Sequence, residues 1–420
     1  MSLFDDWTES RAIRSIGTNT GAPPVAFQSW HRFKEAFPPE FVHRALRDGG
    51  EDIRACLDPF GGSGTTALTA QFLGVSSTTI EVNPFLADVI KAKLASYDAD
   101  ALAREFAGIR RRATRLRVDP AQHFAEVPPT FIEPGASERW LFSLGVAAEL
   151  ASLLTAIDAV EDELHRRFFR VLVGGLLADV SNFVVSGKGR RYRRDWKNRQ
   201  AAAADVSRAF LARAQLAIAD THRFAGRPAV PSSVINGDAR RVRIRSKHDV
   251  AVFSPPYPNS FDYTDVYNVE LWMLGYLSTA SDNRVLRGST LTSHVQLARD
   301  YPEPPVGSRT LRRTMNQLLS IRQDLWSPWI PAMVGGYFAD LIAVLRRVRG
   351  SLREHAQCWL VVGDSRYGGV NVPTGQVLKE LAPSIGWRVE AKEPVRSMRS
   401  SPQHGGRTEL PETLLRLQRL

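Results

Sequence analysis

The sequence predicts an α/β fold: a doubly wound, mostly parallel sheet with an antiparallel edge and a helical insertion. Short apolar runs that end in Asp, Glu or Gly recur along the chain, and segments with helical periodicity lie between them. Strands that alternate with helices in this way form parallel sheets. The runs expected to form these strands are 53–58, 78–81, 233–236, 250–253 and 358–362.

Two further apolar runs, 387–390 and 412–417, are separated by a loop rather than by a helical pattern. Strands joined without a crossover helix pair antiparallel, and an antiparallel strand at the edge of a parallel sheet is a permitted ending. We therefore expect these two runs to close the sheet.

The alternation of strands and helices stops over residues 95–231. Long helical patterns such as 149–159 and 161–180 take over there, together with a basic loop. A second, irregular interruption with several prolines spans about 278–329. The expected organisation is a first half of the core, a helical insertion and a second half of the core, at residues 1–94, 95–231 and 232–420.

Composition sets limits on the class of protein. The 420 residues are 43% hydrophobic and 24% charged, which is ordinary for a soluble globular protein. Lys and Arg exceed Asp and Glu by 55 to 44, and a net charge of +11 favours a polyanionic partner. Cys56 and Cys358 lie inside apolar runs, so we expect two buried thiols, no disulfide framework and no metal site. The N-terminus lacks the features of a signal peptide and no apolar run approaches the roughly 20 residues of a membrane span, so a cytoplasmic protein is expected.

A glycine-rich turn follows the first expected strand, immediately after Asp58. Glycines between a strand and a helix let the backbone approach a ligand closely. No lysine follows the last glycine, which excludes a nucleotide P-loop, and the spacing is not that of the dinucleotide fingerprint. Asp58 stands where a carboxylate can take the ammonium of an amino acid moiety. Glu81 closes the next strand 23 positions later, a spacing that suits a carboxylate binding two ribose hydroxyls, and Asn83 then turns the chain away.

The tetrad Ser254-Pro255-Pro256-Tyr257 directly follows the expected strand 250–253. Two prolines fix the backbone and remove two N–H donors, which leaves rigid carbonyl groups pointing outward. A rigid carbonyl and a small hydroxyl can accept hydrogen bonds from an amino group, and a tyrosine ring offers a face on which a base can stack. Such a loop suits a reaction in which an –NH₂ nitrogen attacks an electrophilic methyl group.

Together these motifs resemble those of S-adenosylmethionine-dependent amino-methyltransferases of the DNA N4-cytosine and N6-adenine group. The resemblance implies a seven-stranded sheet, S-adenosylmethionine as methyl donor and the tetrad in its serine form as catalytic motif. It makes Glu81 the ribose-binding acid and Asp238 the acid that contacts the cofactor's adenine, while the segment with His31 and Phe33 covers the methionine end. The residues expected to bind the cofactor are His31, Phe33, Asp58, Pro59, Phe60, Gly61, Gly62, Ser63, Gly64, Thr65, Glu81, Asn83 and Asp238.

The serine form of the tetrad favours cytosine N4 as the target of a site-specific DNA methyltransferase. An N6-adenine DNA enzyme, an RNA amino-methyltransferase and a catalytically inactive nucleic-acid binder stay open as alternatives. C5-cytosine chemistry needs a thiol nucleophile beside the prolines, and neither cysteine lies there. The cofactor loop precedes the tetrad, whereas the common N4-cytosine order is the reverse, so the family pattern does not assign the target-recognition region. The implied partners are double-stranded DNA with a flipped target base and a cognate restriction nuclease.

The basic run 187–199 interleaves Lys and Arg with Tyr192 and Trp196. Its cations are expected to pair with phosphates, and Phe261, Tyr263 and Tyr267 after the tetrad are candidates to line a flipped-base pocket. Tyr267 shares a helical spacing with apolar residues, which favours a place in the core. The residues expected to contact nucleic acid are Lys188, Arg190, Arg191, Arg193, Arg194 and Phe261, and Arg396, Arg399 and His404 are further candidates to approach the target strand.

Overall fold

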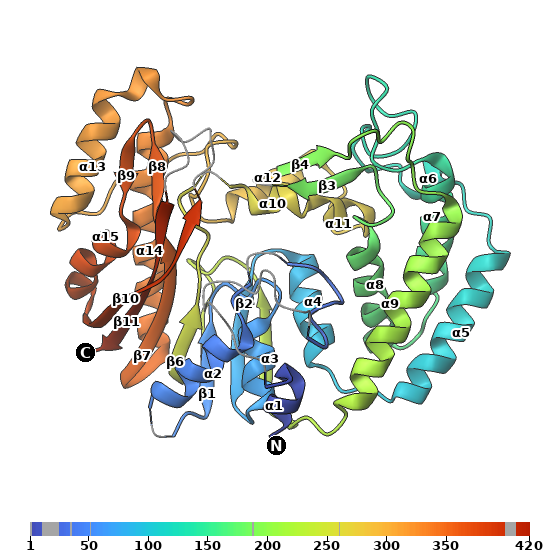
Figure 1. Cartoon of the computed structure of the whole chain (residues 1–420), viewed down its shortest axis with the longest axis horizontal. Coiled ribbons are helices and arrows are strands. Elements are labelled where there is room, and N and C mark those ends of the chain that lie inside the picture. Colours follow the sequence, from blue (N-terminus) through green and yellow to red (C-terminus); the bar gives the residue numbers. More distant parts are fainter. Residues whose placement is uncertain are drawn as a thin grey trace.

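The computed structural model describes residues 2–10, 25–33, 36–50, 52–186, 189–259, 261–399 and 409–420, and its centre is a seven-stranded sheet (Figure 1). The strands follow one another across this sheet in the order β10-β11-β7-β6-β1-β2-β5. Their bounds are β1 Ala55–Asp58, β2 Ser76–Glu81, β5 Ser232–Asn236, β6 His248–Phe253, β7 Leu352–Gly363, β10 Trp387–Arg399 and β11 Glu409–Arg419.

The pairing confirms the predicted doubly wound, mostly parallel sheet. β1 pairs in parallel with both β2 and β6. The sheet is therefore extended on both sides of β1, first by β2 and later in the chain by β6. β6 pairs in parallel with β7, whereas β11 lies antiparallel between β7 and β10. The antiparallel edge is thus made by one reversed strand that joins the outermost strand to the rest.

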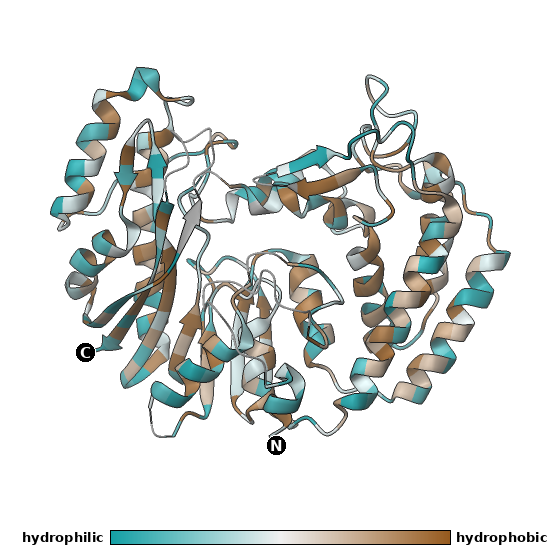
Figure 2. Cartoon of the chain, viewed as in Figure 1, coloured by the Kyte–Doolittle hydropathy of each residue, from teal (hydrophilic) through white to brown (hydrophobic). Residues whose placement is uncertain are grey.

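Side chains of the central strands alternate between two apolar layers, as the pleat of a strand requires. In β6, Val250 and Val252 pack with helix α2 (Pro39–Asp48), whereas Ala251 and Phe253 pack with helix α14 (Ile330–Ser351). Figure 2 shows hydrophobic residues along the central strands and on the sides of the helices that face the sheet. Both cysteines are buried in these layers, as predicted.

Further helices pack near the sheet and add to the two apolar layers. The remaining helices near the sheet are α1 Leu3–Thr8, α3 Thr65–Phe72, α4 Pro84–Leu94, α15 Thr374–Leu381 and the 3₁₀ turn η2 Ala382–Ile385.

The helical insertion stands beside α4 at the right of Figure 1. Its helices share one apolar cluster with α4, so the insertion continues the core of the molecule. Within the basic run, residues Gly189–Tyr192 form a strand that pairs with Phe183–Ser186 in a two-stranded hairpin. The elements of the insertion are α5 Ala99–Arg115, α6 Pro120–His123, α7 Leu144–Asp158, α8 Glu163–Leu176, β3 Phe183–Ser186, β4 Gly189–Tyr192 and α9 Ala203–Arg223.

The segment between β6 and β7 is irregular in part, as expected, but it contains several helices. A small hairpin after β7 packs against one of them, α13. The elements of this region are α10 Tyr263–Val266, α11 Asn268–Met273, α12 Ala280–Gly288, α13 Arg309–Ser320, the 3₁₀ turn η1 Arg322–Asp324, β8 Ser365–Tyr367 and β9 Val370–Val372.

Several strands are longer than the apolar runs that predicted them. β7 begins at Leu352, and its next three residues are exposed, while β10 continues to Arg399 with alternating exposed residues. Exposed strand ends and edge strands carry polar side chains, so hydrophobicity alone does not reveal them.

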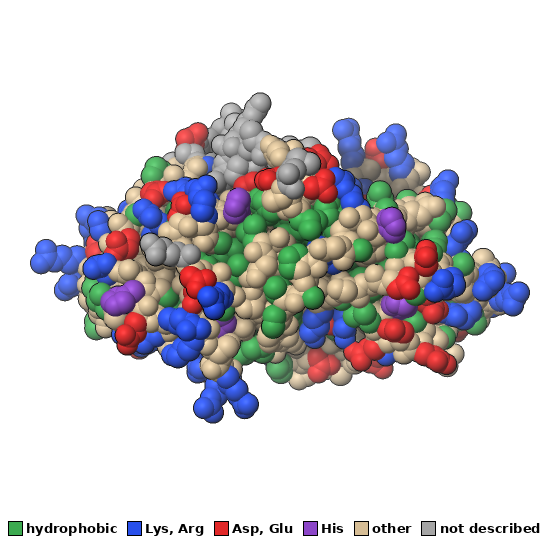
Figure 3. All heavy atoms as spheres, turned by 90° about the horizontal axis from the view of Figure 1, so that it is seen from below, with side chains coloured by type: hydrophobic (Ala, Val, Ile, Leu, Met, Phe, Trp, Pro, Cys, Tyr) green, Lys and Arg blue, Asp and Glu red, His purple; other side chains and the backbone are tan. Residues whose placement is uncertain are grey.

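Charged residues are spread over the surface. The face seen in Figure 3 carries Lys and Arg mostly toward its periphery, with Asp and Glu among them, and hydrophobic side chains gather near its middle. The excess of positive charge therefore does not form one continuous basic surface on this face. Among the residues that the structure describes, no helix is long and apolar enough to cross a lipid bilayer.

Candidate active site

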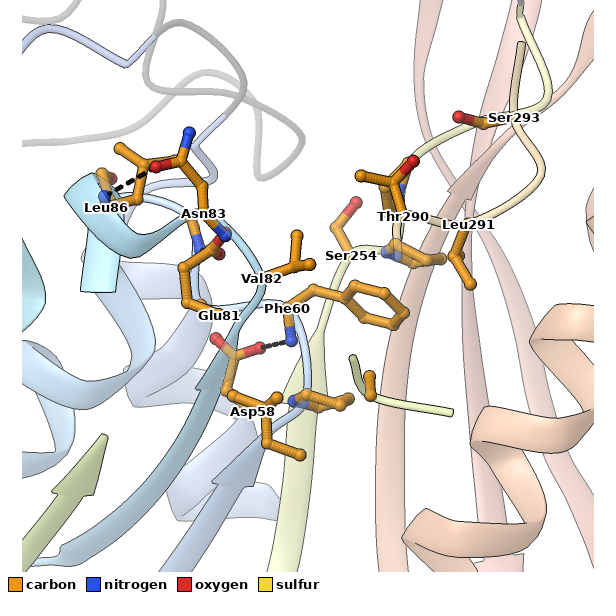
Figure 4. Close-up of a pocket in the computed structure, with 18 of the residues that line it drawn as sticks. Asp58, Phe60, Glu81, Val82, Asn83, Leu86, Ser254, Thr290, Leu291 and Ser293 are labelled. Atoms are coloured by element: carbon orange, nitrogen blue, oxygen red, sulfur yellow. Dashed lines mark hydrogen bonds between the residues drawn. The ribbon is translucent and has the colours of Figure 1, made fainter. Parts of the chain in front are cut away.

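A cavity of about 360 Å³ opens at the carboxyl edge of the sheet, beside the point where the strand order reverses between β1 and β6. Doubly wound sheets bind their ligands at this position. Figure 4 shows Asp58, Glu81 and Asn83 on one side of the cavity and Ser254, Thr290 and Ser293 toward the other. The predicted site residues that line it are Phe33, Asp58, Pro59, Phe60, Gly61, Gly62, Ser63, Thr65, Glu81, Asn83, Asp238, Ser254, Pro255, Pro256, Tyr257 and Phe261.

The glycine turn is held in a fixed shape by the sheet beneath it. The Gly61 N–H donates to the Ile80 carbonyl over 2.9 Å, and a Cβ on Gly61 would lie 2.4 Å from Cγ2 of Thr79. Gly62 and Gly64 adopt φ of +51° and +84°, a region that favours glycine. Gly64 is not among the residues that line the cavity, and its role is this turn.

Glu81, at the end of β2, turns its carboxylate into the cavity and is tied to the loop. Its two oxygens accept hydrogen bonds from the backbone N–H groups of Gly62 (2.7 Å) and Asn83 (2.8 Å). Burial raises the pKa of Glu81 to about 7, against the opposing effect of these two donors. A carboxylate offers about four acceptor positions, so two remain for a ligand.

Asp58 lies at the end of β1, next to Glu81 across the sheet. One of its oxygens accepts a hydrogen bond from the Phe60 N–H over 2.9 Å. Burial raises the pKa of this carboxyl to about 6. Titratable groups that share one cavity and have pKa values shifted by burial are typical of functional sites.

A buried lysine supports the glycine turn from behind. Lys93 of α4 is fully buried, and its ammonium donates to the Ser63 carbonyl over 2.7 Å. Burial lowers the pKa of Lys93 to about 7. Sequence reasoning missed this residue, because a lysine at the end of an amphipathic helix usually faces solvent.

His31 does not line the cavity, although it was predicted to bind the cofactor. It is buried, and its ring meets the Phe85 ring edge-on with centroids 5.0 Å apart. Neither ring nitrogen has a hydrogen-bond partner among the described residues, and burial lowers the pKa of His31 to about 3. Its neutral ring packs behind the wall that Phe33 presents to the cavity.

Asp238 follows β5 and lines the far side of the cavity. Its carboxylate is held by the Arg240 guanidinium, with Nε–Oδ1 and Nη2–Oδ2 distances of 2.9 and 2.8 Å. Arg240 also donates to Asp340 of α14 over 2.8 Å. This network fixes the orientation of Asp238 at the position where the resemblance expects an adenine contact.

The tetrad leaves β6 and enters a hydrogen-bonded chain that ends on the last strand. The Ser254 hydroxyl donates to Tyr257 Oη over 3.2 Å, and the Tyr257 hydroxyl donates to Glu412 over 2.6 Å. Arg396 of β10 donates to the other oxygen of Glu412 over 2.6 Å. Arg396 and Glu412 both line the cavity, and Glu412 was not predicted from the sequence.

Aromatic rings form one wall of the cavity. The ring of Phe33 stacks on that of Tyr267, with centroids 5.1 Å apart and planes 18° apart. Tyr267 is buried, as its helical spacing predicted, and it also lines the cavity. Phe261 is buried and lines the same cavity, and its contact with a flipped base stays a prediction.

The irregular segment after the tetrad supplies polar groups that sequence reasoning missed. Ser293 and His294 line the cavity. His294 lies 3.7 Å from the buried carboxylate of Asp262, which Arg287 contacts at 2.5 Å. Burial lowers the pKa of His294 to about 4, so its ring is neutral at pH 7.

The arginines of the basic run fall into two groups. Arg193 donates to the Ser181 and Ala178 carbonyls over 3.0 and 2.6 Å, and Arg190 lies 3.5 Å from Asp265. Arg191 and Arg194 are exposed. Lys188 and His404 lie outside the described residues, as do the side-chain surroundings of Tyr263 and Arg399. Half of the predicted phosphate-binding arginines are therefore engaged within the chain.

Comparison with curated proteins gives relatives that are named type II methyltransferases. No family model matches the chain. It is 22% identical over 431 residues to the type II methyltransferase M.AvaI of Nostoc sp., covering 91% of this chain and 82% of that one. It is 23% identical over 417 residues to the type II methyltransferase M.BsoBI of Geobacillus stearothermophilus, covering 86% and 79%.

Among solved structures, the glycopeptide N-methyltransferase MtfA in complex with S-adenosylmethionine aligns with 94% of this chain and 97% of its own. The TM-score is 0.29 at 9% identity, which adds nothing to the sheet order seen directly. The two type II methyltransferases, which align with most of this chain, are therefore the relatives that bear on its function. The chain is related over most of its length to enzymes named type II methyltransferases.

Proposed function

We propose that this protein is a DNA methyltransferase that transfers a methyl group from S-adenosylmethionine to an exocyclic amino group of a base, with cytosine N4 as the preferred target. One observation carries the proposal: the glycine turn, Asp58 and Glu81 share a single cavity with the Ser254 tetrad. The relation to type II methyltransferases over most of the chain supports it.

The cavity fits S-adenosylmethionine by the donors and acceptors it offers. Glu81 has acceptor positions left for two ribose hydroxyls, because its fixed hydrogen bonds use only one position on each oxygen. Asp58 provides a carboxylate for the ammonium of the methionine moiety, and Asp238 provides an acceptor for the adenine amino group. When bound, the cofactor supplies an electrophilic methyl group.

The tetrad then holds the target amino group. The nitrogen of such a group is a poor nucleophile because its lone pair is delocalised into the ring. Hydrogen bonds from its two N–H groups to Ser254 Oγ and the Pro255 carbonyl favour a pyramidal nitrogen and return electron density to it. These bonds strengthen as positive charge develops on the nitrogen, so they stabilise the transition state more than the bound substrate.

The target base enters beside the aromatic wall. Tyr257 would stack on a base turned out of the duplex, and base stacking on an aromatic ring contributes about 1–3 kcal/mol. The exposed Arg191 and Arg194 are candidates for phosphate contacts. The tetrad alone does not separate cytosine N4 from adenine N6, since both present an –NH₂ group.

The identity of the modified base tests the proposal. The protein is incubated with labelled cofactor and either duplex DNA or duplex RNA, and the product is digested to nucleosides for mass spectrometry. We expect N4-methylcytosine from DNA, formed about 10- to 150-fold more slowly by a Ser254→Ala variant. N6-methyladenine would correct the base, a product from RNA alone would correct the substrate, and no methylated nucleoside would refute the activity.

A further inference from the structure

Glu412 is a buried carboxylate in the wall of the cavity. Glu412 is 1% exposed. It belongs to β11, where it pairs with Gly363 of β7. Its partners are the Tyr257 hydroxyl and the Arg396 guanidinium, each at 2.6 Å.

Arg396 forms an ion pair with this carboxylate. A buried carboxylate is unstable unless it is paired and hydrogen-bonded, and Arg396 supplies both the charge and the hydrogen bond. An ionised carboxylate can only accept hydrogen bonds. The Tyr257 hydroxyl therefore has to donate its single proton to Glu412.

This fixes the direction of the next hydrogen bond. With its proton committed to Glu412, the Tyr257 oxygen is available to Ser254 only as an acceptor. The Ser254 hydroxyl therefore donates to Tyr257 over 3.2 Å. A serine hydroxyl has one proton and two lone pairs, so Ser254 then faces the cavity as an acceptor.

We propose that Glu412 is a positioning residue that, through Tyr257, fixes Ser254 as a hydrogen-bond acceptor and so selects a base with an amino group over one with a carbonyl at the same position. The inference rests on the proposed function and gives it a basis for selectivity. Cytosine presents an N4 amino group that donates to Ser254. Uracil presents an O4 carbonyl at that position, and two acceptors would then face each other.

The isosteric substitution Glu412→Gln should reverse the chain. The side-chain oxygen of the glutamine would face Nε of Arg396, because an amide NH₂ there would meet that donor at 2.6 Å, whereas Nη2 of Arg396 lies 3.5 Å from the oxygen on the Tyr257 side. The amide NH₂ would then donate to Tyr257, whose hydroxyl proton would turn to Ser254. Ser254 would be left to donate into the cavity, toward a carbonyl.

The experiment measures binding of two duplexes that carry cytosine or uracil at the methylated position, each opposite an abasic site, so that neither base has to break a pair. We expect the parent protein to prefer cytosine by about 10- to 100-fold, the size of one mismatched polar contact in a buried site. In Glu412→Gln the ratio should fall to near one or invert. Tyr257→Phe, which cuts the chain, should lower the ratio without inverting it.

The matched control is Glu393→Gln on the neighbouring strand, where the carboxylate contacts Arg44 and Arg416 at 3.2 Å outside the cavity. It should keep the parental ratio. A parental ratio in Glu412→Gln, with both duplexes bound equally more weakly, would assign Glu412 a purely structural role and overturn the inference. If Glu412→Gln does not fold, an unchanged ratio in Tyr257→Phe overturns it instead. Methyl transfer by the parent protein tests the proposed function separately, so the two failures are distinguishable.

Discussion

Replacing Glu81 with glutamine should weaken the binding of S-adenosylmethionine and flatten its dependence on pH. In the parent protein, burial raises the pKa of Glu81 to about 7 and that of Asp58 to about 6. Ribose hydroxyls and an ammonium group are bound best by ionised carboxylates. Affinity should therefore rise with pH through this range and fall as pH drops below about 7 and then below about 6.

The magnitude follows from the contacts. Well below its pKa, each pH unit reduces the ionised fraction of a carboxyl group about tenfold, so Glu81 alone should lower the affinity by up to that factor per unit. Glu81→Gln removes a charged acceptor, which corresponds to about 1.5–3 kcal/mol or roughly 10- to 150-fold in affinity. The glutamine also has one acceptor atom for the two N–H groups of Gly62 and Asn83, so one of these donors loses its partner.

Isothermal titration calorimetry from pH about 5 to about 8 measures both effects. The variant should keep only the weaker slope near pH 6 that Asp58 provides. Glu105→Gln, at a partly exposed carboxylate of α5 that contacts Arg112 at 2.9 Å, is the matched control and should behave as the parent. A Glu81→Gln protein with the affinity and the pH profile of the parent would show that this carboxylate does not bind the cofactor.

Three further outcomes are expected. Ser254→Ala should lower kcat about 10- to 150-fold while leaving cofactor affinity unchanged, and equal single-turnover rates would place the chemistry elsewhere. Replacing Arg191 and Arg194 with alanine should reduce the log–log salt slope of DNA binding by roughly 0.9 for each lost phosphate contact, whereas Arg193→Ala should lower the unfolding temperature instead. Between pH about 7 and about 10 the unfolded chain protonates Lys93 and the folded chain does not, so this residue makes stability rise with pH there. Lys93→Met should remove that rise in thermal melts, and an identical pH profile in both proteins would contradict it.

The part of the site that could be predicted from sequence is the part that local order determines. Asp58 and Glu81 end adjacent strands, and Ser254 follows a third. Because parallel strands share a carboxyl edge, each motif could be placed at that edge without knowing the register.

Glu412 could not be found this way. It lies 155 residues from Tyr257 and reaches it only because β11 pairs with β7 in one register. The sequence shows merely an acid at the start of an apolar strand. His294 falls in a segment without periodicity, where no pattern indicates which side chains turn inward. For the arginines, charge identified the run, but which of them bond to backbone carbonyls depends on the fold of the hairpin.

The place of β11 between β7 and β10 couples the cavity to the corner of the sheet. β10 comes earlier in the chain, yet it pairs with the sheet through β11, so we expect β10 and β11 to open and close as one unit. Glu412 belongs to that unit, and a base held by Tyr257 would stabilise it against local unfolding. Amide hydrogen exchange along β10 and β11 should therefore slow when the cavity is filled, which turns the backbone of this corner into a reporter of substrate occupancy.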